Sequence, residues 1–207
     1  TGTQLGQHVY ADVTIASLLN KIDEFMLNWH QQHPLKSGLS VGVLQSAIPF
    51  LSKEAIQHLS TLALELGRLQ MKKGLLHHPT FTVTLDPTQQ TEIDKILQQL
   101  NATGLEGLAL NTFKDVPTEI IGYLLDNALV IRVQTQLLHP QHLQHLIQQL
   151  SEFFQDNAEL STTDFKTITQ LSRKFSIPVL EWMDENQKTL RRGDTRLAGP
   201  SLSKELE

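Results

Sequence analysis

Apolar residues recur at helical spacing near the start of the chain and predict a helix over Val13–His30. A short helix over Val41–Ile48 follows, and Ser52 is the expected N-cap of a third helix that Gly67 closes. The basic stretch Arg68–Lys72 then leads through a loop to Phe81–Leu85, whose apolar alternation predicts a strand. The order is therefore three helices, a strand, a loop and a strand.

The same order recurs twice more. Asp86-Pro87 marks a boundary, after which helices are expected from Thr88 and from Pro117, and strands over Leu129–Val133 and at Leu137-Leu138. A third round begins with a long helix over Pro140–Phe154 and continues with a short helix capped by Ser161 or Thr162. We divide the chain into a polar remnant of a preceding module (1–12), three modules (13–86, 87–139 and 140–199) and a polar tail (200–207).

Three helices followed by a hairpin are the winged-helix form of the helix-turn-helix. The predicted fold class is mainly α with small β-hairpins, arranged as tandem winged-helix modules. The third helix and the hairpin, or wing, are the usual contact surfaces of such a module. The ends of the second and third modules can be aligned with one gap. The aligned pairs are Asp126-Asn127 with Asp184-Glu185, Arg132 with Arg191, and Leu137-Leu138 with Arg196-Leu197.

The third wing has a definite expected register. A Gly193-Asp194 turn of type II′ would pair Arg191 with Arg196 and Leu190 with Leu197. Because side chains alternate across a hairpin, we expect the two leucines to face the core and the two arginines to stand together outside. Directly opposed like charges are unfavourable, and a phosphate between them would reverse the sign of that interaction. The alternative is two arginines splayed into water.

The helix before this wing has a separate basic feature. Its apolar face contains Trp182, which is expected to pack in the core and not to stack on a base. Arg173 and Lys174 lie off that face, close to the helix start, where free amides and the positive dipole end favour phosphate. The N-cap is either Ser172, which places Pro178 inside the helix, or Ser176.

Charge supports a local polyanion contact. The whole chain has a net charge of −5, which excludes a general polycationic nucleic-acid coat. Residues 166–196 nevertheless contain seven basic and four acidic residues, a net +3, so the remainder has a net charge of −8. A small basic island in an acidic body indicates one polyanion-binding surface. The first two modules are interpreted mainly as spacers.

Motifs for other chemistry are missing. The chain has no Cys, no phosphate-binding glycine motif, and no apolar run near the roughly 18 residues that cross a bilayer. The histidines at 139, 142 and 145 and the pairs at 30/33 and 77/78 are interpreted as solvated, with no metal site. We expect no catalysis, no membrane contact and no signal peptide. The chain also lacks a starting Met, so we expect it to begin partway through a larger protein.

Two segments resemble a known family. The run SRKFSIPVLEWMDENQKTLRRGDTRL at 172–197 is similar to the last winged-helix module of bacterial selenocysteine-specific elongation factors (SelB). That module has a Ser-Arg-Lys-aromatic start, a Pro-x-Leu-Glu helix and an arginine-rich wing around Gly-Asp. The wing here has an extra Leu190 relative to that pattern. Residues 29–39, WHQQHPLKSGL, resemble a segment of the family's second module.

The resemblance implies a function. It implies that the last module binds the selenocysteine insertion hairpin of mRNA, through phosphates and an extruded loop base. RNA loops suit protein recognition because the A-form major groove is closed to side chains. By position, the implied RNA contacts are Arg173, Lys174, Arg191, Arg192 and Arg196.

The family also implies a parent protein. Upstream domains would bind GTP and Mg²⁺, carry selenocysteinyl-tRNA to the ribosome and work in the cytoplasm, while this fragment needs no cofactor. Two alternatives remain open on the residues alone. One is a winged-helix regulator of double-stranded DNA, and the other is a protein-interaction scaffold.

Overall fold

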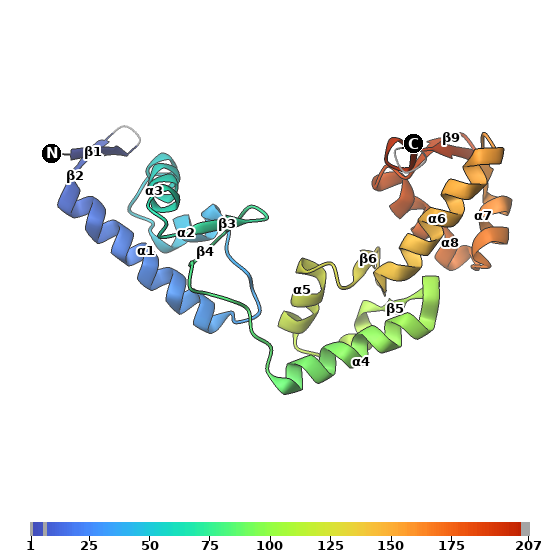
Figure 1. Cartoon of the computed structure of the whole chain (residues 1–207), viewed down its shortest axis with the longest axis horizontal. Helices are drawn as coiled ribbons and strands as arrows, with labels where there is room; N and C mark the ends of the chain where they lie inside the picture. The colour runs from blue at the N-terminus through green and yellow to red at the C-terminus, as the bar shows by residue number, and fades with distance from the viewer. Residues whose placement is uncertain (1, 6–7, 204–207) are drawn as a thin grey trace. The chain divides into compact units, whose positions relative to one another are not determined.

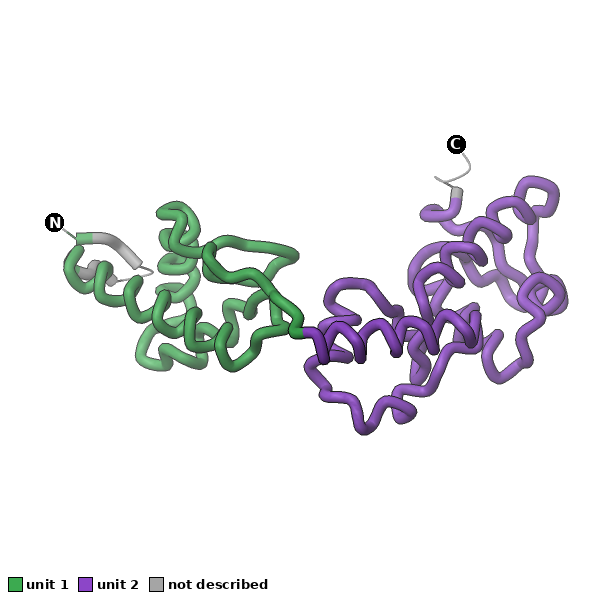
Figure 2. Tube along the Cα trace, turned by 60° about the horizontal axis from the view of Figure 1, so that its bottom comes forward, with its two compact units in different colours: residues 1–86 green, residues 87–207 purple. Residues whose placement is uncertain are grey.

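The computed structural model describes residues 2–5 and 8–203 and separates into two compact units, residues 1–86 and 87–207 (Figures 1 and 2). The expected boundary at Asp86-Pro87 is the point where the two units divide. The finer division into three modules stays a prediction. None of the helices in the described ranges is both long and apolar enough for a membrane span.

The first unit is a winged helix preceded by a hairpin. Its elements are β1 (Gly2–Leu5), β2 (His8–Ala11), α1 (Asp12–Gln32), α2 (Val41–Ala47), α3 (Lys53–Glu65), β3 (Gln70–Lys72) and β4 (Leu75–His77). The core lies between α1, α2 and α3 and is built from aliphatic side chains such as Ile22, Leu44 and Ile56. The Ser52 hydroxyl accepts from the Ala55 amide at 3.2 Å, so the predicted N-cap of α3 is confirmed.

Two expectations for the first unit are wrong. The strand predicted over Phe81–Leu85 is irregular chain, because the wing closes earlier through a two-residue Lys73-Gly74 turn. Phe81 instead stacks on His30, with ring centroids 3.6 Å apart. His30 is not solvated but 2% exposed, and its Nε2 accepts from the His78 amide at 3.2 Å. Burial, followed by the nearby His77 and His78, lowers the pKa of His30 to about 4.

The second unit contains the other two helix–hairpin repeats. The elements up to residue 139 are α4 (Pro87–Thr103), η1 (Gly104–Glu106), β5 (Leu108–Ala109), η2 (Leu110–Phe113), α5 (Thr118–Asp126), β6 (Ile131–Val133) and β7 (Gln136–Leu138). The elements after it are α6 (Pro140–Asp156), β8 (Leu160–Ser161), α7 (Thr162–Thr169), α8 (Arg173–Glu185), β9 (Thr189–Arg192), β10 (Thr195–Ala198) and α9 (Pro200–Ser203).

The second and third repeats share one hydrophobic core. Val133 and Leu138 of the second wing are buried in the cluster formed by α6, α7 and α8. The tip of that wing also reaches α8, where the Gln134 side-chain amide donates to Glu181 at 2.5 Å. The second wing therefore covers part of α8, and the two repeats pack as one unit.

Each third helix ends in the same way before its wing. The residue after the helix cap has a positive φ: +69° at Gly67, +54° at Ala128 and +57° at Gln187. The next amide then bonds a carbonyl five residues back, as in a Schellman end. These bonds are Arg68 to Ala63, Leu129 to Leu124 and Lys188 to Met183, each 2.8 Å.

This common end sets the alignment of the repeats. Arg132 corresponds to Arg191 and Leu137 to Arg196, as the sequence alignment proposed. Asp126, however, corresponds to Glu185 and not to Asp184, so the first aligned pair was shifted by one residue.

In the second and third wings, a third strand is added to the hairpin. β5 pairs with β7, and β8 pairs with β10, which gives three-stranded antiparallel sheets in the order β5-β7-β6 and β8-β10-β9. β5 and β8 are two residues each and were not predicted. Because β8 runs directly into α7, the third wing is attached to the start of that helix.

Candidate nucleic-acid interface

The third wing has the predicted register. Arg192 pairs with Thr195, Arg191 with Arg196, and Leu190 with Leu197. Gly193 has a φ of +61°, which suits the first position of a type II′ turn. Arg191 is exposed, and its Nε donates to the Gly193 carbonyl at 3.3 Å.

The faces of this wing are the reverse of the prediction. Arg196 is only 7% exposed, whereas Leu190, expected in the core, is 47% exposed. The physical reason is a carboxylate beneath the wing. Both carboxylate oxygens of Asp184 in α8 accept from Arg196 Nε at 3.2 Å. Asp184 Oδ2 also pairs with Arg196 Nη2 at 3.1 Å. The same carboxylate accepts from the Thr189 hydroxyl at 2.5 Å.

The two opposed arginines therefore differ in their exposure to solvent. Arg196 has its charge neutralised inside the module, so only Arg191 of the pair presents a guanidinium to solvent. Arg192 lies on the other face, with a side chain 70% exposed and a long 3.6 Å contact to Glu159. An exposed pair of this kind contributes little to stability, so Arg192 remains available to a ligand.

The α7 and α8 helices begin in different ways. Ser161 caps α7 in a full capping box with Asp164, and hydrogen bonds donated by the Ser161 hydroxyl and amide lower the pKa of the Asp164 carboxyl. Ser172 is the N-cap of α8, but its side chain makes no cap hydrogen bond. Pro178 therefore lies inside α8, the first of the two predicted arrangements. Arg173 and Lys174 are both exposed in the first turn, where the helix dipole adds positive potential.

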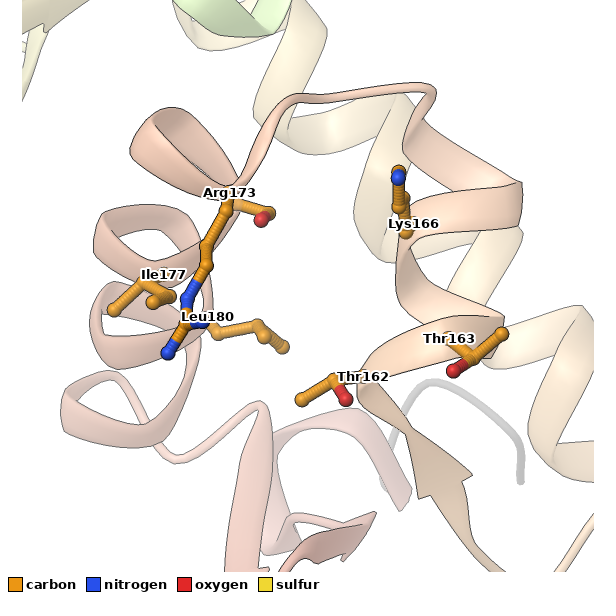
Figure 3. Close-up of a pocket in the computed structure, with 7 residues that line it drawn as sticks. Thr162, Thr163, Lys166, Arg173, Ile177 and Leu180 are labelled. Atoms are coloured by element: carbon orange, nitrogen blue, oxygen red, sulfur yellow. The ribbon is translucent and has the colours of Figure 1, made fainter.

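A groove lies between these two helices (Figure 3). It encloses about 510 Å³, with Thr162, Thr163 and Lys166 from α7 on one side and Arg173, Ile177 and Leu180 from α8 on the other. Arg173 and Lys166 are exposed, and neither forms an ion pair with any residue in the described part of the chain. The groove therefore combines two uncompensated cations, hydroxyl groups and an apolar wall.

Lys166 is a candidate residue that the sequence interpretation missed. It was counted in the basic island but not placed at the site. The missing information was the crossing of α7 and α8, which brings residues seven positions apart in sequence to one groove. Lys174, in contrast, does not line the groove, and its Nζ lies 5.1 Å from the centre of the Phe175 ring.

The groove and the wing are joined through the pairing of β8 with β10. Ser161, the cap of α7, pairs in the sheet with Thr195 of the wing, and Thr162 at the groove follows directly. The Thr195 hydroxyl also bonds Glu159 at 2.8 Å, which adds a second link between these segments. We call four exposed cations the basic face: Lys166 and Arg173 at the groove, and Arg191 and Arg192 near the tip of the wing, where they project to opposite sides of the hairpin. Cations of this kind on a rigid support bind phosphate groups.

Comparison with known proteins identifies proteins that are similar to this chain. Residues 152–198, which contain α7, α8 and the third wing, match the family model described as "Elongation factor SelB, winged helix". A selenocysteine-specific elongation factor of Desulfomicrobium baculatum is 27% identical over 184 residues, which is 84% of this chain and 29% of that protein. This chain is similar to selenocysteine-specific elongation factors. The predicted resemblance to the SelB winged-helix region is confirmed.

A solved structure shares the fold of this chain. The crystal structure of bacterial selenocysteine-specific elongation factor EF-Sec matches 95% of this chain and 32% of its own length, with a TM-score of 0.56 and 19% identity. The mRNA-binding domain of SelB from E. coli, solved in complex with SECIS RNA, matches 56% of this chain and 99% of its own, with a TM-score of 0.43 and 18% identity. The mainly helical winged-helix fold class is confirmed by the SelB model match.

Proposed function

We propose that the third module of this chain binds an mRNA stem-loop, the selenocysteine insertion hairpin, on its basic face. The observation that carries the proposal is the backbone pairing that joins two cationic features of the third module. Arg173 and Lys166 flank the α7–α8 groove, and the wing that presents Arg191 and Arg192 is paired by backbone to the start of α7. The SelB model match covers this same segment.

The arrangement suits a hairpin loop. In this proposal the wing arginines and the exposed cations in the first turn of α8 neutralise phosphates of the stem and loop. The groove offers hydroxyls and the apolar side chain of Ile177 beside its cations, which suits an unpaired base. Arg173, Lys174, Arg191 and Arg192 remain our predicted RNA contacts from the sequence, and Lys166 is added to them.

The geometry disfavours double-stranded DNA. A recognition helix must enter the major groove along its exposed face. On α8 that face includes Glu181, which is held by Gln134 of the second wing. A duplex would therefore meet both a carboxylate and a neighbouring module. An RNA loop needs only the basic face.

The wider role follows from the relatives. The chain spans 29% of the length of the curated elongation factor, so we propose that it is the non-catalytic RNA-binding part of a longer GTPase. In this proposal the GTP and Mg²⁺ sites lie in other domains, and the whole factor delivers selenocysteinyl-tRNA to the ribosome in the cytoplasm.

A fluorescence anisotropy titration tests the proposal. Labelled selenocysteine insertion hairpin, the same stem with a scrambled loop, and a DNA duplex of equal length are each titrated with the chain. The proposal expects the native hairpin to bind at least tenfold more tightly than either control. Equal affinity for the native and scrambled loops would refute hairpin recognition, and tighter binding of the duplex would favour the DNA alternative.

A further inference from the structure

In the first two modules, apolar residues occupy one position of the third helix and two positions of the wing, which we call the apolar seam. In the first wing, Leu69 and Leu76 occupy the buried positions, at 1% and 0% exposure. In the second wing, the equivalent residues are Val130 and Leu137, at 2% and 0%. The equivalent helix positions are Leu64 and Leu125, each five residues before the first wing residue of its seam.

The third module replaces all three members of this seam with polar residues. Asp184 stands where the other helices have leucine, Thr189 replaces Leu69 or Val130, and Arg196 replaces Leu76 or Leu137. The three side chains satisfy one another through the hydrogen bonds to the Asp184 carboxylate. The fold itself does not demand these residues, since two modules of the same chain are built without them.

We infer that Arg196 is a positioning residue, which holds the wing on α8 through Asp184 and does not contact the RNA. This inference rests on the proposed RNA binding by the third module, and it removes one residue from the set that the family resemblance implied. The positive charge presented by the wing then comes from Arg191 and Arg192.

The geometry supports this assignment. Nε and Nη2 of Arg196 both point to Asp184, and the residue is almost completely buried. Reaching a phosphate would require breaking the ion pair and leaving Asp184 without its charged partner, which is costly. Arg191, directly opposite in the hairpin, needs no such rearrangement because it is exposed, and among the described residues its side chain bonds only its own turn.

The test transplants the apolar seam of the second module. The triple variant Asp184→Leu, Thr189→Val, Arg196→Leu copies Leu125, Val130 and Leu137. It is compared with wild type, Arg196→Leu and Arg191→Leu in thermal melts and in hairpin titrations at several salt concentrations. A buried ion pair can often be replaced by apolar residues without loss of stability.

The positioning role predicts a rescue. Arg196→Leu alone should melt lower and bind about tenfold more weakly, because the partly buried Asp184 loses its charged partner. The triple variant should recover the melting temperature and bind within about threefold of wild type, with an unchanged salt slope. Arg191→Leu should lose about one unit of that slope.

Two results would overturn the inference. A triple variant that melts normally but loses about one unit of salt slope would show that Arg196 contacts a phosphate. An Arg196→Leu variant that melts and binds the hairpin as wild type does would show that Arg196 does not hold the wing on α8. Failure of wild type to prefer the hairpin would instead count against the proposed function, and the melting comparison would still test the seam.

Discussion

Arg191 and Arg132 occupy equivalent positions in two wings of the same chain. Each donates from Nε to the carbonyl of the first turn residue, Gly193 at 3.3 Å and Gln134 at 2.9 Å. Their surroundings differ, because only Arg191 belongs to the basic face. Arg132 is therefore a matched control for the effect of removing a wing arginine.

Arg191→Ala should weaken hairpin binding about tenfold and reduce the slope of log K against log salt by about one unit, because one phosphate contact is lost. Arg132→Ala should change neither quantity. Titrations of both variants at four salt concentrations give the comparison. An unchanged slope for Arg191→Ala would remove this residue from the RNA contacts.

His30 gives a second prediction at this scale. Its pKa is lowered to about 4 in the folded chain, against about 6.5 when unfolded. The unfolded chain therefore binds the proton more readily between these values. The free energy of unfolding of the first unit should be highest above pH 6.5 and fall by about 3 kcal/mol as the pH drops to 4.

Urea unfolding of the first unit across this pH range measures the effect. His30→Gln should flatten the dependence, whereas the exposed His33→Gln should retain it. The same dependence in both variants would assign it to other groups.

The sequence predicted residue pairs better than residue orientations. The register of the third wing followed from the Gly193-Asp194 turn alone, and it is correct. Which face turns inward depends on what lies under the hairpin, and the turn residues do not show that Asp184 lies there. The burial of His30 similarly depends on Phe81, which lies 51 residues away in sequence.

At the scale of elements, a residue in the left-handed region leads from each third helix into its wing. Gly67 adopts this conformation without strain, whereas Ala128 and Gln187 adopt it against the steric preference of a Cβ. Ala128→Gly should therefore raise the free energy of unfolding of the second unit by about 1 kcal/mol. Chemical denaturation measures this, with Gly122→Ala within α5 as a helix-propensity control. A destabilised Ala128→Gly would contradict the strain assignment.

The long elements were predictable and the short ones were not. α1, α4 and α6 each have an apolar face of several turns, and their predicted positions agree with the structure to within a few residues. β5 and β8 have two residues each, which is too short for an alternation pattern, and they exist only through pairing with a distant hairpin. The link between the groove and the wing could therefore not be predicted from the sequence.

At the scale of the whole molecule, the shared core joins the second and third repeats. Val133 and Leu138 are 1% exposed, and the atoms that bury them belong largely to the third repeat. A fragment of residues 87–207 should unfold in one cooperative transition. A fragment of residues 140–207 should melt at a lower temperature, because it exposes the apolar surface that the second wing covers. Equal melting temperatures would show that the shared core adds no stability.

The basic face as the RNA-binding surface is the central claim, and the salt dependence of binding tests it most directly. Lys166, Arg173, Arg191 and Arg192 are replaced together by alanine, and hairpin affinity is measured over a range of salt concentrations. The account predicts that the slope of log K against log salt falls by about three units and that preference for the native loop is lost. A variant that retains the wild-type slope and preference would contradict it.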